Sequence, residues 1–418
     1  MRDARQRYGD SRRAGVLAVI LLAGLAVCCG SPERQAREYI RLAVALGERD
    51  PDSIDFYYGP PEWVYDVRKN PPRLDQIRDS AAKLAGELES IPRLRSRRLA
   101  RQLRAIAERA DELLGVRRSF DERTQIYFGV IAPAPPAERF EEDRAQLEKL
   151  LPGKGSLAER YGAFDRQFLI PADRLPAVMA RALGGCRDQS AAHLRMPAGE
   201  SVRVAYVHDK PWSAFSRYQG NFQSVISINA DLPLTVDRAL QLACHEGYPG
   251  HHAQSVLQDV QLVRNQHLME FTVQPAYSPQ SFVSEALATY AVNIAFPGSE
   301  RMRFERDALF PLAGLDPAKA AAYLKIERLV DKLAAAEPAI ARDFLSGKLE
   351  WARAAAALQQ QAAMEHPEQT LKYINEYRTY MITYTLGAEY AARRARDWRQ
   401  FAALMVDPDA ADRLIINR

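Results

Sequence analysis

The chain has 418 residues, of which 47% are hydrophobic and 26% are charged. This composition suits one large folded unit or two to three ordinary domains, and it excludes a disordered chain, a coiled coil and a small disulfide scaffold. The formal net charge is +4, but residues 1–27 contribute +3 of it and leave about +1 for the rest. A nucleic-acid-binding protein needs a strongly basic surface, so we expect no nucleic-acid partner.

Residues 1–29 have the layout of an export signal. Five Arg residues precede an apolar run at 14–27, and Cys28-Cys29-Gly30-Ser31 follows that run. Fourteen apolar residues are too few to span a bilayer, which takes roughly 17–25, but they suit a cleavable secretory signal peptide. The Leu-Ala-Val-Cys-Cys end resembles a bacterial lipobox, in which Cys28 or Cys29 would carry the lipid. We therefore expect an exported, lipid-anchored protein on the periplasmic side of a membrane, of the outer-membrane lipoprotein type.

After the signal, the periodicity of apolar residues predicts a series of amphipathic helices. They fall at Pro32–Glu48, Leu74–Ser90, Leu94–Leu114, Phe120–Gly129, Glu138–Leu151 and Pro171–Leu194. Alternating Val- and Ile-rich segments at 201–207 and 222–229 predict two strands, and helices resume from Thr235 to the end of the chain. The predicted fold is mainly α with a small antiparallel β-sheet. Residues 30–195 form an N-terminal helical region that we expect to be one compact unit with residues 196–418.

Beyond the signal, the cysteines are Cys186 and Cys244. We expect two buried thiols, because Cys244 directly precedes the motif described next. An oxidising compartment would allow a disulfide between them instead.

Three of the seven His residues lie in the stretch His245-Glu246-Gly247-Tyr248-Pro249-Gly250-His251-His252. Thr235 and Asp237 suit the start of a helix, which would deliver His245 and Glu246. Neutral imidazole is a good zinc ligand, and the adjacent carboxylate points to another helix face, where it is free to act on a metal-bound water. This stretch therefore predicts a metal site.

The second histidine ligand is ambiguous from spacing alone, because Pro249 stands four residues after His245. On a regular helix His252 would share a face with His245, whereas His251 would be roughly 120° away. A break at Pro249-Gly250 would rotate His251 back towards the metal. Both alternatives stay open at this point.

The His-Glu-Gly-Tyr-Pro-Gly-His stretch resembles the His-Glu-x-x-Pro-Gly-His signature of the bacterial domain-of-unknown-function 885 family, which belongs with the gluzincin-type metallopeptidases. The resemblance implies a large multi-helix metallopeptidase-like fold, with residues 196–418 as its catalytic region and one Zn²⁺ as its cofactor. It implies His245 and His251 as zinc ligands and Glu246 as the general base. His252 becomes a neighbour that supports the site or faces the substrate.

A third ligand is expected from a Glu on a later helix. Ser284-Glu285-Ala286-Leu287-Ala288-Thr289-Tyr290 resembles the family's Glu-Gly-Trp-Ala-x-Tyr segment, with Ala286 and Leu287 in place of Gly and Trp. The resemblance implies Glu285 as the ligand. Independently, Glu285 lies among apolar residues, where burial of a carboxylate costs several kcal/mol unless a cation or hydrogen bonds compensate it.

Four tyrosines near the C-terminus, Tyr373, Tyr377, Tyr380 and Tyr384, share one helix face, which usually indicates core packing. Tyr384-Thr385-Leu386-Gly387 resembles the family's Tyr-x-x-Gly, in which the Tyr faces the metal. The resemblance implies that Tyr384, with Tyr380 as second choice, stabilises an oxyanion. Arg378 beside them is expected to bind a substrate carboxylate or to form a surface salt bridge.

Two further segments are candidates for the substrate cleft. By analogy with such metallopeptidases, the 222–229 strand, with Asn229 at its end, is expected to be an edge strand that binds an extended peptide substrate by main-chain hydrogen bonds. The aromatic block from Asp55 to Trp63 is expected either to line a cleft or to pack in the core.

The sequence as a whole thus favours a zinc metallopeptidase attached to a membrane by lipid. The alternatives are a noncatalytic metal-binding envelope lipoprotein or scaffold, and a hydrolase of non-peptide amides. They differ at Glu246, because a structural metal site is indifferent to that carboxylate.

Overall fold

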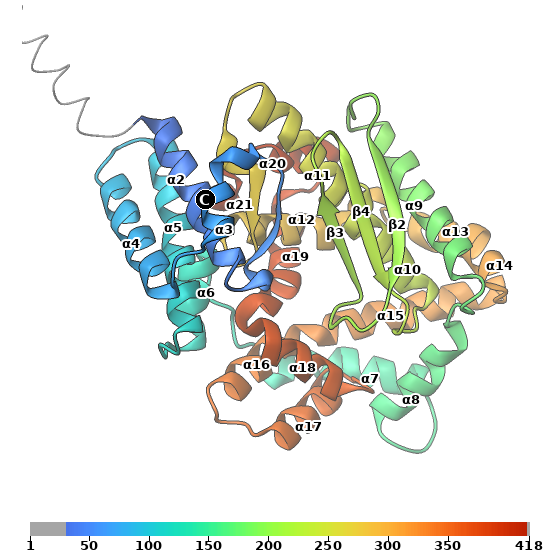
Figure 1. Cartoon of the computed structure of the whole chain (residues 1–418). Coiled ribbons are helices and arrows are strands. Elements are labelled where there is room, and N and C mark those ends of the chain that lie inside the picture. Colours follow the sequence, from blue (N-terminus) through green and yellow to red (C-terminus); the bar gives the residue numbers. More distant parts are fainter. Residues whose placement is uncertain (1–30, 416–418) are drawn as a thin grey trace, which may run out of the picture.

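The computed structural model describes residues 31–415 (Figure 1). The predicted signal peptide and the candidate lipidation residues Cys28 and Cys29 lie outside these residues. Among the helices of residues 31–415, none combines the length and the apolar character that crossing a membrane requires.

The N-terminal part is a group of packed helices, visible on the left of Figure 1. They are α2 (Pro32–Gly47), α3 (Tyr65–Lys69), α4 (Leu74–Glu89), α5 (Leu94–Leu113) and α6 (Phe120–Phe128). Serines cap two of them: the Ser31 hydroxyl accepts from the backbone of Arg34, and Ser119 forms a capping box with Glu122. Helices α2, α4 and α5 share an apolar core of their own that also contains Val273.

The next helices lead into a three-stranded sheet. The helices are α7 (Glu141–Leu150), α8 (Leu157–Asp165) and α9 (Leu175–Ala191), and the strands are β2 (Ser201–Val207), β3 (Ala214–Tyr218) and β4 (Gln223–Asn229). The sheet order is β2-β4-β3. Strand β4 is antiparallel to β3 but parallel to β2, so the sheet is mixed rather than wholly antiparallel as expected. The short strand β3, which the sequence did not reveal, returns the chain between the two predicted strands and makes them run in the same direction.

The remainder of the described chain is mainly helical and contains the large core. Its helices are α10 (Val236–Leu242), α11 (His251–Gln258), α12 (Pro279–Ala295), α13 (Glu300–Phe304), α14 (Phe310–Ala313), α15 (Ala320–Leu333), α16 (Glu337–Leu345), α17 (Trp351–Gln361), α18 (Pro367–Tyr377), α19 (Ile382–Arg394), α20 (Trp398–Met405) and α21 (Ala410–Ile415). Helix α12 is buried along most of its length and packs against α19. The mainly α fold class is confirmed.

Glycine allows α12 and α19 to approach closely. A Cβ atom at Gly387 would lie 3.1 Å from both Cα and Cβ of Ala286, closer than most side chains tolerate. Ala286 follows Glu285 directly, and Tyr384 is one turn before Gly387. The close approach therefore sets Tyr384 beside Glu285 in the fold.

A two-stranded antiparallel sheet joins the N-terminal part to the rest. It pairs β1 (Ile54–Tyr57) with β5 (Val273–Pro275), and the register shifts between Ile54 and Phe56, so that Asp55 is the extra residue of a β-bulge. Aromatic residues of this segment also pack on β3: the ring centroid of Tyr218 lies 6.0 Å from that of Phe56 and 4.9 Å from that of Tyr58. These contacts fix β1 between the N-terminal helices and the larger sheet.

The expectation of two buried thiols is wrong, because Cys186 and Cys244 form a disulfide. Helix α9 packs along residues 243–247, and this packing brings the two Cα atoms to 5.4 Å, within the range that a disulfide requires. Disulfides persist in oxidising compartments outside the cytoplasm, which agrees with the predicted export.

Candidate metal centre

The Pro249-Gly250 pair produces the helix break that the sequence allowed. Helix α10 continues into a π-helical turn, Ala243–Gly247, which carries His245 and Glu246, and α11 begins at His251 after three non-helical residues. The Gly250 amide donates to the Cys244 carbonyl oxygen at 3.0 Å. A Cβ atom at Gly250 would lie 1.8 Å from the His245 carbonyl oxygen, so this tight return requires glycine.

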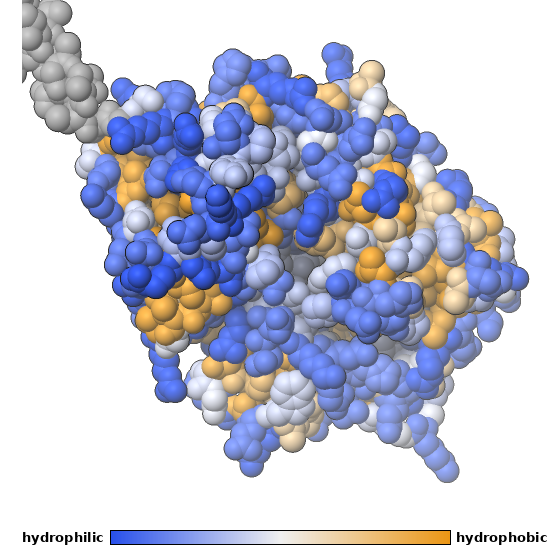
Figure 2. Space-filling view, in the orientation of Figure 1, coloured by the Kyte–Doolittle hydropathy of each residue, from blue (hydrophilic) through white to orange (hydrophobic). Residues whose placement is uncertain are grey.

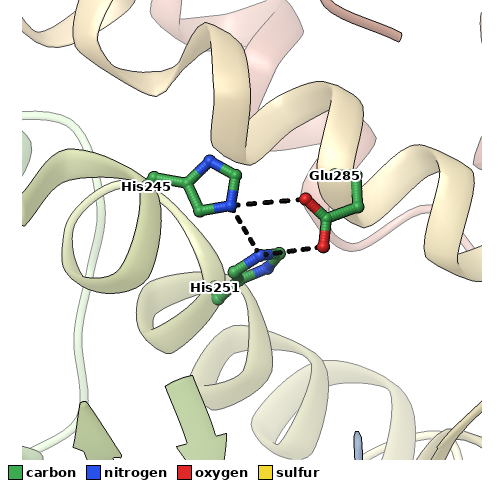
Figure 3. Close-up of side chains that lie close together, drawn as sticks. All are labelled: His245, His251 and Glu285. Atoms are coloured by element: carbon green, nitrogen blue, oxygen red, sulfur yellow. Dashed lines mark hydrogen bonds and ion pairs between the residues drawn. The ribbon is translucent and has the colours of Figure 1, made fainter. Parts of the chain in front are cut away.

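The return brings His251 to the side of His245, and Glu285 of α12 faces both (Figure 3). The two Nε2 atoms are 3.1 Å apart. Glu285 places Oε2 3.3 Å from Nε2 of His245 and Oε1 3.3 Å from Nε2 of His251. Within residues 31–415, these three side chains are the group of His, Cys, Asp and Glu that could hold a metal ion.

The triangle formed by these atoms has the dimensions of a zinc site. Zinc binds nitrogen and oxygen at about 2.0–2.1 Å, so adjacent ligand atoms of a tetrahedral zinc lie about 3.3 Å apart. The observed separations of 3.1, 3.3 and 3.3 Å match this edge length. Two imidazoles and one carboxylate are also a donor set typical of catalytic zinc sites. The residues present therefore fit a zinc ion.

Glu285 is almost fully buried, as its apolar neighbours predicted. Its Oε1 accepts a hydrogen bond from the Tyr380 hydroxyl at 2.8 Å, whereas its Oε2 has no hydrogen-bond partner. Burial alone would raise the pKa of Glu285, but His251 and His245 hold that pKa well below its usual range. Burial likewise opposes the charged form of His251, yet the Glu285 carboxylate outweighs it and raises the pKa of His251 to about 9. In the absence of a metal, Glu285 and His251 thus form an ion pair.

A chain of hydrogen bonds orients His251. The Ser284 hydroxyl donates to Oε1 of Gln254 at 2.9 Å, so its oxygen is left to accept from Nδ1 of His251 at 3.1 Å. A proton on Nδ1 leaves the Nε2 lone pair of the neutral ring free for a metal. The tautomer that a metal ligand needs is therefore the one that these neighbours favour.

His252 faces away from this cluster and is completely buried. Its Nδ1 lies 2.7 Å from the Ser224 hydroxyl and its Nε2 lies 2.9 Å from Oε2 of Glu200. Burial lowers the pKa of His252. Because both ring nitrogens of His252 have protein partners, this residue connects α11 to β4 and has no nitrogen left for a metal. The structure therefore favours His251 as the ligand.

Glu246 and Tyr384 both line the cavity next to the cluster. Glu246 is 5% exposed, and its Oε2 has no hydrogen-bond partner. The Tyr384 ring centroid lies 6.1 Å from that of His245, and the Tyr384 hydroxyl lies 3.1 Å from the hydroxyl of Tyr373. The expectation that four tyrosines share one helix face is wrong, because α18 ends at Tyr377 and α19 begins only at Ile382. All four, Tyr373, Tyr377, Tyr380 and Tyr384, nevertheless line the cavity.

The cavity has a volume of about 230 Å³. Figure 2 shows the surface hollowed near its centre, between the positions of α19 and β3 in Figure 1. Strand β1 supplies Asp55 to its wall, β3 supplies Phe215 and Arg217, and α18 and α19 supply tyrosines. Residues from the N-terminal part, the sheet and the C-terminal helices therefore enclose one site.

The expectation that β4 is the edge strand is wrong. Both edges of β4 are paired, and β3, whose outer edge has no partner strand in the described part of the chain, lines the cavity instead. Asn229 is buried, and its amide group donates to the carbonyls of Lys210 and Trp212 at 2.9 and 3.2 Å, so it supports the β2–β3 connection.

Arg378 also does not line the metal cavity. It lies at the end of α18, where its Nε is 3.8 Å from Oε1 of Glu112. The salt-bridge alternative therefore agrees with the structure.

Sequence reasoning left Asp55 undecided between cleft and core, and the structure places it in the cavity wall. Burial, followed by the charge of Glu285, raises the pKa of Asp55 to about 7. Its bulge position could not be recognised from the sequence, because a bulge depends on pairing with a strand more than 200 residues away.

The sequence matches no family model, and no curated protein shows significant similarity to it. One solved structure, of a protein from Colwellia psychrerythraea inferred to be a lipoprotein, is similar over 84% of this chain and 68% of that chain. Its sequence identity is 14% and its TM-score is 0.46. A similarity at this level shows nothing about function.

Proposed function

We propose that the protein is a zinc-dependent peptidase that is exported and anchored to a membrane by lipid. Three ligands leave one position of a tetrahedral zinc open, which is the arrangement of catalytic rather than structural zinc sites. The observation that carries the proposal is Glu246, a buried carboxylate whose Oε2 has no partner and which lines the cavity beside the three ligands. A site that only stored or displayed a metal would have no use for this costly group.

The residues of the chain have separate roles in this proposal. His245, His251 and Glu285 would hold the ion, whose chemistry is to polarise water and lower its pKa towards about 7. Glu246 accepts the proton of the attacking water and delivers it to the leaving amine. The Tyr384 hydroxyl donates a hydrogen bond to the oxygen of the carbonyl under attack.

The edge of β3 supports a peptide as substrate. Its residues 214–217 line the cavity, and an unpaired strand edge offers main-chain donors and acceptors to an extended chain. A peptide bound in this way would lie across the cavity that contains Glu246 and the zinc ligands. This support is specific to peptides, because other amides lack the repeating main-chain groups.

The test is the substitution Glu246→Gln in the zinc-loaded protein. We expect zinc content to stay near one per chain, while hydrolysis of a mixture of short peptides falls at least about 10²-fold. Glu365→Gln, a change of the same kind at a half-buried carboxylate paired with Arg166, serves as the matched control. Unchanged hydrolysis in Glu246→Gln would rule out the mechanism, and a native protein that takes up no zinc would rule out the site.

A further inference from the structure

We propose that Asp55 binds the free α-amino group of the substrate, so that the protein removes residues from the amino terminus of short peptides. This inference deepens the proposed peptidase function and rests on it. It starts from the observation that Asp55 is an acidic side chain in the cavity wall that contributes nothing to the ligand triangle.

The bulge in β1 explains how Asp55 reaches the cavity. Ile54 pairs with Pro275 and Phe56 pairs with Gln274, which leaves Asp55 as the residue without a partner on β5. An extra residue of this kind redirects its side chain, and bulges are common next to active sites for this reason. Strand β5 leads directly to α12, which carries Glu285, so the bulge and the metal ligand share one support.

Asp55 has no partner among the described residues. No hydrogen bond or ion pair to its carboxylate occurs in residues 31–415, although the charges of Glu285, His251, Glu246 and Arg217 all act on it from a distance. Burial of an unpaired carboxylate is costly, and most buried carboxylates are paired for this reason. An unpaired carboxylate that faces a cavity is a site for a positively charged ligand.

The other charges of the cavity agree with a cationic ligand. Among its lining residues, Arg217 is the one Lys or Arg, and its exposed guanidinium lies over the Phe215 ring at 5.7 Å from the centroid. A zinc ion would offset the charges of Glu285 and Glu246. The charge of Arg217 offsets that of Asp55 only in part, because the pKa of Asp55 is still raised. A peptide ammonium group supplies the missing charge together with hydrogen-bond donors.

Proximity to the ligands favours the α-amino group over a lysine side chain. In an amino-terminal residue, the ammonium nitrogen is separated from the scissile carbonyl carbon by one atom, so its binding site must lie next to the metal. Asp55 meets this condition, because it lines the same cavity as the ligands and interacts electrostatically with His251 of α11 and Glu285 of α12. Asp52, which lines the same cavity and is exposed, does not, because the charges that act on it are those of Asp50, Glu376 and Arg109.

Binding of uncleaved peptides tests this inference independently of catalysis. Zinc-loaded Glu246→Gln protein is titrated by calorimetry with Leu-Gly-Gly, with N-acetyl-Leu-Gly-Gly and with N-acetyl-Lys-Gly-Gly. Acetylation removes the ammonium group that would form a charge-assisted hydrogen bond with Asp55, so the free peptide should bind at least about tenfold more tightly than either acetylated peptide. Adding Asp55→Asn should abolish this preference, whereas Asp52→Asn, the same change at an exposed lining residue, should preserve it.

Several results would overturn the inference. These are equal binding of free and acetylated Leu-Gly-Gly, no binding of either, tight binding of N-acetyl-Lys-Gly-Gly, or the same loss in Asp52→Asn as in Asp55→Asn. The comparison of peptides on the parent protein needs no variant at Asp55, so it holds even if Asp55→Asn does not fold. Cleavage of acetylated peptides as fast as free ones would leave the peptidase function intact and overturn the role of Asp55. Tighter binding of the free amine without any cleavage would support the role of Asp55 and overturn the peptidase function.

Discussion

The Ser284 hydroxyl oxygen lies 3.1 Å from Nδ1 of His251 and accepts its hydrogen bond. Ser284 precedes Glu285 on α12, so two neighbouring residues contact opposite sides of one imidazole ring. We expect Ser284→Ala to bind zinc about 10–100-fold more weakly, because the ring loses the bond that fixes its tautomer. Chelator competition measures this affinity, and an unchanged value would mean that the ring is held by packing alone.

The two adjacent histidines should respond differently to substitution. We expect His251→Ala to lose stoichiometric zinc, whereas His252→Ala should keep it and lose about 1–3 kcal/mol of stability, because Ser224 and Glu200 lose their buried partner. Elemental analysis gives the zinc content, and urea unfolding gives the stability. Zinc loss in His252→Ala alone would identify that residue as the ligand.

Zinc affinity should increase with pH. In the zinc-free protein His251 is protonated below a pKa of about 9, and the metal must displace this proton. The apparent association constant should therefore rise about tenfold per pH unit between about 6.5 and 9, then level off. Competition titrations at pH 6.5, 7.5 and 8.5 test this. A flat profile would show that His251 is already neutral without metal.

Gly250→Ala should disrupt the metal centre. Because the new Cβ would clash with the His245 carbonyl oxygen, the backbone that joins the two histidines must move. We expect a loss of about 3 kcal/mol or more of unfolding free energy, together with zinc. Gly184→Ala on α9 is the matched control: nothing lies within 4 Å of its new Cβ, so stability should rise by up to about 1 kcal/mol. Retention of zinc by Gly250→Ala would show that the turn is adaptable.

Tyr384→Phe tests the assignment of the oxyanion donor. Loss of one such donor typically lowers kcat about 10²–10³-fold, and we expect KM and zinc content to change little. Tyr290→Phe, on α12 but outside the cavity lining, should have native kinetics. A larger effect of Tyr380→Phe on kcat with zinc retained would transfer the role to Tyr380, whose hydroxyl bonds Glu285.

The regular elements were predictable because they depend on local periodicity. Helices α4 and α5 end within one residue of their predicted bounds, since their apolar faces and flanking prolines are local signals. Strand β3 was missed because five residues that include Ser and Arg carry no alternation signal. Because β3 was missed, the strand at 222–229 was wrongly expected at the edge of the sheet, whereas β3 occupies that edge.

The metal centre was predictable in composition but not in geometry. His245, Glu246 and Glu285 could be selected by residue type and apolar context, whereas the choice between His251 and His252 depended on a backbone break. Asp55 and the Cys186–Cys244 disulfide depended on contacts between distant segments, which no local pattern encodes.

The residues that line the cavity run from Pro51, near one end of the described chain, to Tyr384, near the other. If the polypeptide crosses a membrane amino end first, the cavity wall, the zinc ligands and the tyrosines can come together only after nearly the whole chain has crossed. Under the proposed function, a chain still in transit could not attack the proteins around it. Hydrolysis would begin only after export is complete, in the compartment that receives the folded protein.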